Sequence, residues 1–142
     1  MAYPLQPITV TASTTLAKDT HAGTVVNVSA AAGLTLTLPA STGKGDEYSV
    51  FVLTTVTSNG YIIKVANATD IFAGAVGVST DAAGVTILAG TTDDTITMNG
   101  STTGGLIGSN IRIKDVSAGF WQVSGFLVST GAEATPFSAT VS

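Results

Sequence analysis

The chain has 142 residues, the length of one ordinary domain, with 9 acidic and 5 basic side chains, one histidine and no cysteine. The formal net charge of −4 disfavours binding to nucleic acid, and the lack of cysteine excludes disulfides and thiolate chemistry. Because only 10% of the residues are charged, threonine, serine, asparagine and glycine must cover the surface, which suits β-sheets better than helices.

Alternation of apolar and polar residues predicts six strands along the chain. In chain order they are 8–10, 26–28, 34–38, 48–52, 96–98 and 111–113. Each segment has one face suited to burial and one suited to solvent. No segment repeats apolar residues at helical spacing over three turns, so the sequence predicts an all-β protein.

Turn signals separate these strands. Asn59-Gly60 and Asn99-Gly100 are dipeptides that accept positive φ and favour tight hairpins. Strands and turns that alternate roughly every 8 to 12 residues are typical of antiparallel sandwiches and barrels. We therefore expect an antiparallel β-sandwich or jelly-roll-like barrel at 9–129, with extended arms at 1–8 and 130–142.

One pattern occurs twice, at 36–65 and at 96–123. In each copy a strand leads to a small polar loop, a glycine exit and a second strand, and then to a Gly-aromatic pair, Gly60-Tyr61 or Gly119-Phe120. Two interpretations stay open. The pattern is either a duplicated three-strand unit that forms the two halves of a sandwich or a chance similarity in a sequence of low diversity.

The two ends of the chain lack the alternation that a place in the core requires. Such arms hang free or lie on a neighbouring subunit, and an aromatic residue beside a proline favours the second. Phe120 and Trp121 are neighbours in a strand, so one should point inward and the other outward or into an interface. The candidate interface residues are Tyr3, Pro4, Leu5, Trp121, Pro136 and Phe137.

Groups that could carry catalysis are scarce in the sequence. Nucleophilic catalysis needs a base beside the nucleophile, and the one histidine, His21, lies in a segment that resembles a solvated turn. No Gly-x-Ser-x-Gly motif occurs, and Gly43-Lys44-Gly45 lacks the leading glycine and the Ser or Thr of a phosphate loop. We expect no enzymatic activity, no catalytic residue and no cofactor.

Asp93 and Asp94 are adjacent acids within 89–105 that could supply oxygen ligands to calcium, together with Asn99. Adjacent strand residues point to opposite faces, so both acids cannot reach one ion without a bulge or a turn. The favoured interpretation is a strand-entry pair in water followed by a hairpin turn and a polar loop, with no metal. Weak calcium binding stays open as the alternative.

Export and membrane insertion are not indicated. The first ten residues have neither a basic region nor a continuous apolar region of the kind found in secretory signals. Every apolar stretch is broken well before 18 residues. We therefore expect a protein made in the cytoplasm, without contact with a membrane.

The order of the segments LTLTLPASTGKGDEYSVFV, SNGYIIKVANATDIFAG, TDDTITMNGSTTGG and IRIKDVSAGFWQVSG resembles small virion proteins of tailed bacteriophages, of the capsid decoration or cement type. The resemblance covers most of residues 9–142 and consists of strand and turn patterns. It implies a β-rich homo-oligomer, a homotrimer in preference to a dimer, on the outer surface of the phage head. There it would bind the major capsid protein and stabilise contacts between capsid subunits, with no catalytic residues.

A glycan- or receptor-binding module of a phage tail fibre or spike is the alternative. Such a module would use exposed aromatic rings with Asn or Asp side chains to hold a sugar. Binding to glycans, without binding to isolated capsids, would favour this class over the decoration class.

Overall fold

The computed structural model describes residues 5–141, and their regular structure is almost entirely β. The elements are β1 (Ile8–Val10), β2 (Thr14–Thr15), α1 (Lys18–His21), β3 (Val25–Val28), β4 (Leu34–Thr37), β5 (Glu47–Val52), β6 (Tyr61–Lys64), β7 (Ile71–Ser79), β8 (Gly84–Leu88), β9 (Thr95–Met98), β10 (Asn110–Ser117), β11 (Phe120–Val128) and β12 (Phe137–Ser138). The prediction of an all-β protein is confirmed. Within the described residues no helix has the length and apolar character needed to span a membrane.

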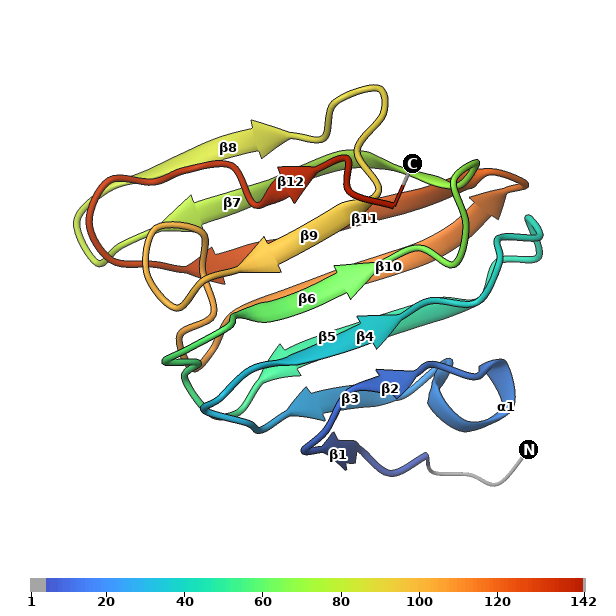
Figure 1. Ribbon diagram of the computed structural model, residues 1–142, viewed down its shortest axis with the longest axis horizontal. Helices are drawn as coiled ribbons and strands as arrows, with labels where there is room; N and C mark the ends of the chain where they lie inside the picture. Colours follow the sequence, from blue (N-terminus) through green and yellow to red (C-terminus); the bar gives the residue numbers. More distant parts are fainter. Residues whose placement is uncertain (1–4, 142) are drawn as a thin grey trace.

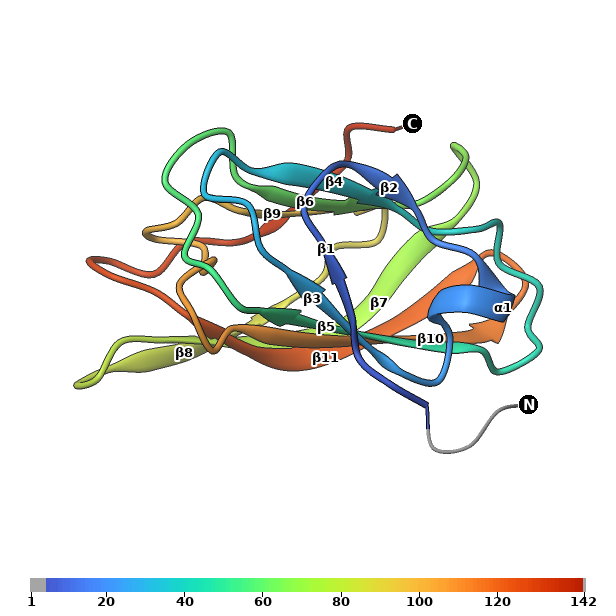
Figure 2. The ribbon, with the colours of Figure 1, turned by 90° about the horizontal axis from the view of Figure 1, so that it is seen from below.

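The strands form two open sheets that lie as two layers (Figures 1 and 2). The first has seven strands in the order β1-β3-β5-β10-β11-β7-β8, and the second has five in the order β12-β9-β6-β4-β2. Each sheet ends in edge strands, so neither closes into a barrel within residues 5–141. The short helix α1 lies at one end of the layers (Figure 2).

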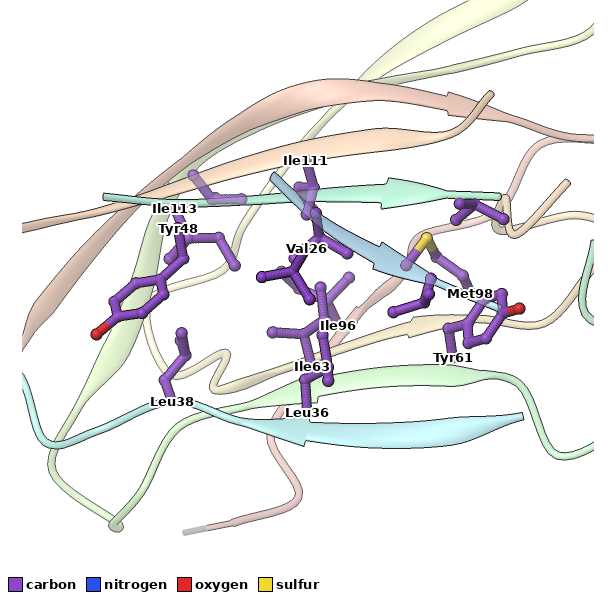
Figure 3. Close-up of a cluster of buried hydrophobic side chains, with 14 of the residues drawn as sticks. Val26, Leu36, Leu38, Tyr48, Tyr61, Ile63, Ile96, Met98, Ile111 and Ile113 are labelled. Atoms are coloured by element: carbon purple, nitrogen blue, oxygen red, sulfur yellow. The ribbon is translucent and has the colours of Figure 1, made fainter. Parts of the chain in front are cut away.

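One hydrophobic core fills the space between the two sheets. Val26, Tyr48 and Ile111 point into it from the seven-stranded sheet and meet side chains such as Leu36 and Ile63 of the other sheet (Figure 3). These side chains are at most 2% exposed. Full burial of one large aliphatic side chain contributes about 1.5–3 kcal/mol. The alternation found in the sequence is therefore the source of the fold's stability.

Many neighbouring strands are parallel, which corrects the prediction of an antiparallel fold. In the seven-stranded sheet β1, β3 and β5 are parallel, and in the five-stranded sheet β2, β4 and β6 are parallel. The chain changes sheet after each of these strands. Two parallel neighbours in one sheet need a long connection between them. Here that connection includes one strand of the opposite sheet. Direct antiparallel neighbours occur later, where β7 is followed by β8 and β10 by β11.

The two Asn-Gly turns have the expected backbone conformation but do not form hairpins. Asn59 and Gly60 have φ of 59° and 73°, and Gly100 has φ of 81°. The first turn lies between β5 and β6 and the second between β9 and β10, and both pairs of strands belong to opposite sheets. The dipeptide encodes the local turn, but not the sheet to which the next strand belongs.

The two similar segments at 36–65 and 96–123 differ in topology. β4, β5 and β6 alternate between the sheets, whereas β10 and β11 lie side by side in one sheet. β4 and β9 also share the five-stranded sheet, so the segments are not the two halves of a sandwich. A repeated three-strand unit is therefore not a feature of this fold.

The C-terminal segment contributes a strand and a buried ring to the fold, which corrects the prediction of an extended arm over the whole of 130–142. β12 pairs with β9, so that Phe137 lies opposite Ile96, and Phe137 is only 5% exposed. The Asp94 carboxylate accepts hydrogen bonds from the backbone N–H groups of Thr140 (2.8 Å) and Val141 (3.1 Å). A two-residue strand is too short for an alternation pattern to reveal.

Gly45 and Gly100 lie in loops that join the two sheets, between β4 and β5 and between β9 and β10. Substitutions at these two positions test how tightly such loops pack. Both have positive φ, 84° and 81°, but a Cβ on Gly100 would collide with the Val56 carbonyl oxygen, while a Cβ on Gly45 meets nothing within 4 Å. We expect Gly45→Ala to cost about 1 kcal/mol from backbone strain alone. Gly100→Ala should cost at least about 2–3 kcal/mol, measured by chemical denaturation. Equal losses for the two variants would contradict this packing.

Candidate docking surface

The predicted interface residues are mostly used within the chain itself. Trp121 is 1% exposed and packs edge-to-face on Tyr48, with 5.9 Å between ring centroids. Pro136 and Phe137 are buried as well. The prediction that these three residues lie in an interface is therefore corrected, since their side chains are buried within the chain and present no surface to a partner.

The remaining candidates lie at the N-terminal end. Leu5 is half-buried and lines a hollow with Lys18 and Asp46. Tyr3 and Pro4 lie outside the described residues, so their part in an interface stays a prediction.

The prediction for the adjacent aromatic pair on β11 is confirmed. Trp121 points into the core, and Phe120 points outward with 45% of its surface exposed. The outward ring, which was not among the candidate interface residues, is the one available to a partner.

His21 and Asp94 are buried, which corrects the expectation of solvated side chains. His21 lies in α1, and its Nδ1 accepts a hydrogen bond of 2.9 Å from the Ala17 backbone N–H. Asp94 is 1% exposed. Asp93 is only half-buried, and its carboxylate accepts a hydrogen bond of 2.7 Å from the Gly90 backbone N–H. Among residues 5–141, no three His, Asp or Glu side chains are grouped so that they could hold a metal ion.

Buried carboxylates fasten the loops that join the sheets. Asp115, on β10, accepts hydrogen bonds from the backbone N–H groups of Thr42 (2.8 Å) and Gly43 (2.7 Å), and Asp70 accepts one from Ser41 (2.9 Å). Hydrogen bonds from backbone N–H groups offset the cost of burying a charge. These acids therefore have a structural role, which their sequence context does not reveal.

A hollow of about 270 Å³ opens beside the core aromatics Tyr48 and Trp121. Burial, and then the nearby charges of Asp46, Asp115 and Asp19, raises the pKa of Tyr48 to about 12. The phenol therefore keeps its proton at neutral pH and cannot act as a base there. The Trp121 Nε1 atom has no hydrogen-bond partner within the described part of the chain.

The most exposed large apolar side chains of the outer face of the seven-stranded sheet lie around β7. Phe126 is 70% exposed and Leu88 is 74% exposed. They stand on β11 and β8, on either side of β7, whose outward residues are mostly small. We call this surface the β7 trough, with a floor of Ile71, Ala73, Ala75 and Gly77 and walls of Phe120, Phe126 and Leu88. Part of it forms a hollow of about 500 Å³.

The register of the strands explains the position of Phe126. It lies directly beside Gly77, and a Cβ on Gly77 would come within 2.8 Å of the ring. The ring thus covers the glycine backbone while its other side remains in solvent. The sequence contained this signal, because Phe120, Phe126 and the polar Gln122 and Ser124 alternate with the buried residues of β11.

Charged residues occupy the other half of the same face. Arg112 and Lys114 stand on β10, and Glu47 on β5 lies 3.5 Å from Arg112 (Nε to Oε1). The floor and walls of the β7 trough are uncharged. The charged side chains of β5 and β10 therefore lie outside the β7 trough.

Comparisons of the chain with protein-family models, curated proteins and solved structures gave no significant match.

Phe137 provides a test of the role of the C-terminal segment. Because its ring is buried beside Ile96, we expect Phe137→Ala to lower the free energy of unfolding by about 3 kcal/mol. The exposed Thr130→Ala in the same segment should change it by less than about 0.5 kcal/mol. Thermal unfolding that is unchanged by Phe137→Ala would show that the segment is a free arm.

Tyr48 provides a test at alkaline pH. An unfolded tyrosine loses its proton near pH 10, while Tyr48 in the folded protein does so near pH 12. Stability from this group is complete below pH 10 and is lost as the pH rises toward 12, because the unfolded state releases its proton first. We expect denaturation experiments to show this loss in the wild type and a smaller one in Tyr48→Phe. Identical pH dependence in both proteins would place the phenol in solvent.

Proposed function

We propose that this chain is a structural virion protein of a tailed bacteriophage, of the capsid decoration or cement type. In this proposal the two layers form a sandwich-type scaffold, and the β7 trough binds the major capsid protein at the outer surface of the phage head. The resemblance of the sequence supports the class. The proposed contact rests on one observation. The β7 trough is exposed and uncharged, and its walls are the side chains of Phe120, Phe126 and Leu88.

The chemistry of the β7 trough suits a protein partner. Exposed apolar surface of this kind, bordered by polar residues, is typical of protein contacts, and aromatic rings supply much of their energy. Gln122 and Ser124 on β11 border the rings. The trough lies on a sheet whose other face is the core, so little conformational entropy would be lost when a partner binds.

Weak individual contacts would suffice on a capsid. A shell repeats the same binding site many times, and an oligomer that binds several sites gains affinity without a new contact. The net charge of −4 would also limit attachment to nucleic acid during assembly.

A glycan-binding function is the second candidate, and one observation favours it. Asn110 lies between Phe51 and Phe126 in a row across the outer face. An amide between two aromatic rings is suited to hold a sugar, which stacks on a ring and bonds through its hydroxyl groups.

Binding to capsids provides the test. Purified protein would be mixed with shells from the phage that encodes it, prepared without this protein, and sedimented. We expect the wild type to bind in many copies per shell. The double variant Phe120→Ser/Phe126→Ser should bind at least about tenfold more weakly. The contact would bury both rings, and their loss removes more than about 1.4 kcal/mol of binding free energy. Ile107→Ser, which replaces a similarly exposed apolar residue elsewhere, is the control.

Other outcomes separate the two functions. Equal losses with the Ile107 variant would show that the trough is not the contact. Binding to a glycan array, lost in Asn110→Ala and absent from shells, would establish the second candidate instead.

A further inference from the structure

The outer edge of the seven-stranded sheet is an open strand. β8 pairs with β7 on one side, and no described residue pairs with it on the other, while the remaining edge strands β1, β2 and β12 have only two or three residues. Natural sheets protect long edges with charges, prolines or bulges. Residues 82–92, which include β8, contain no charged residue and no proline. The unpaired edge of β8 therefore lacks the features that prevent another strand from pairing with it.

The ladder between β7 and β8 shows which backbone groups of β8 face outward. The Ala89 N–H bonds to the Gly74 carbonyl at 2.9 Å, and the Thr80 N–H bonds to the Ala83 carbonyl at 2.8 Å. In an antiparallel ladder, residues that bond to one neighbour alternate with residues that face away from it. The odd-numbered residues of β8 therefore bond to β7, and Gly84, Thr86 and Leu88 present their N–H and C=O groups outward.

β8 carries apolar side chains on both of its faces. Val85 lies opposite Val78 on the core side but is still 47% exposed, so the other sheet leaves it largely uncovered. Figure 1 shows β8 as the outermost strand on this side. Leu88, on the other face, is 74% exposed. A strand added beside β8 would cover part of both faces.

We propose that β8 binds β8 of a second copy of this chain, antiparallel, about a two-fold axis that is perpendicular to the sheet and passes midway between the two Thr86 residues. Thr86 of one copy then faces Thr86 of the other. The outward backbone groups form about six hydrogen bonds between the strands. The two seven-stranded sheets become one continuous sheet.

The side chains of β8 fit this register. Leu88 lies beside Gly84 of the second copy, where no side chain opposes it, and Val85 lies beside Ile87 on the core side. Cross-strand pairs of apolar, β-branched residues stabilise a sheet. A two-fold contact needs a patch that is complementary to itself, and β8 meets that condition.

The lack of charge on β8 is compatible with a second copy as the occupant. Each copy has a net charge of −4, so carboxylates that met across the contact would oppose it. Residues 82–92 carry no charge, so no two carboxylates lie opposite each other along the paired strands. The pairing therefore avoids acid–acid contacts. The pairing shares Leu88 with the β7 trough, but its test is separate from that of the proposed function, because chain mass and binding to shells are measured independently.

Charge substitutions at Thr86 test the two-fold axis. We expect light scattering to give the wild type twice the chain mass, and to give Thr86→Lys and Thr86→Asp the mass of a monomer, with dimerisation at least about tenfold weaker, because like charges meet at the axis. An equimolar mixture of the two variants should restore the dimer, since a lysine of one copy then faces an aspartate of the other. Thr86→Val, which adds no charge, should dimerise as the wild type does.

The result that overturns the proposal is equally definite. A wild type that remains a monomer at about 100 μM would exclude the pairing. A trimer, or a dimer that persists in both charged variants, would place self-association on another surface. Circular dichroism should be the same for all four proteins, because the Thr86 side chain is exposed and its N–H and C=O make no bond to β7.

Discussion

The contact between the two sheets is the interaction on which the rest of this structure depends. The chain has few charged residues, so burial of alternate side chains such as Val26, Leu36 and Ile111 must supply most of the stability. Because the chain changes sheet after each of its first six strands, neither sheet can be completed before the other. Among β1 to β6, each pair of neighbouring parallel strands is separated along the chain by a strand of the opposite sheet. Such a topology has few local contacts, and slow folding is the expected consequence.

The crossings between layers explain the unusual use of acidic residues. A loop that leaves one sheet for the other passes the end of the core, where its backbone N–H groups lose contact with water. Asp70 and Asp115 accept hydrogen bonds from such groups in the loop at 41–43, and Asp94 does the same for the segment after β12. The few acids of the chain thus include several that hold loops in place. None of the chain's acids lies in the floor or walls of the β7 trough.

The sequence predicted what depends on local pattern and missed what depends on distant contacts. Alternation located β1, β3, β4, β5, β9 and the start of β10, because one apolar side chain in two is enough to mark a strand. It missed β6, β7 and β8, and in β7 glycine and alanine dilute the pattern at Gly74, Ala75 and Gly77. Parallel pairing and the burial of His21 and Asp94 depend on segments far away in the sequence. The β7 trough was missed for the same reason, since its walls stand on two strands that β7 separates.

The trough and the open edge have a geometric relation that connects the two proposals. An axis perpendicular to the joined sheet keeps the outer faces of both copies on the same side. A dimer formed through β8 would therefore present two β7 troughs toward one surface. If each trough binds a repeated site on a shell, the second contact forms within a complex already held by the first, and its effective concentration is set by a rigid sheet instead of a flexible linker. Rigid spacing increases the affinity only where the shell's sites match the distance between the troughs. The edge strand would then determine which pairs of sites on the shell the protein can bridge, while the trough would determine how strongly it holds each one.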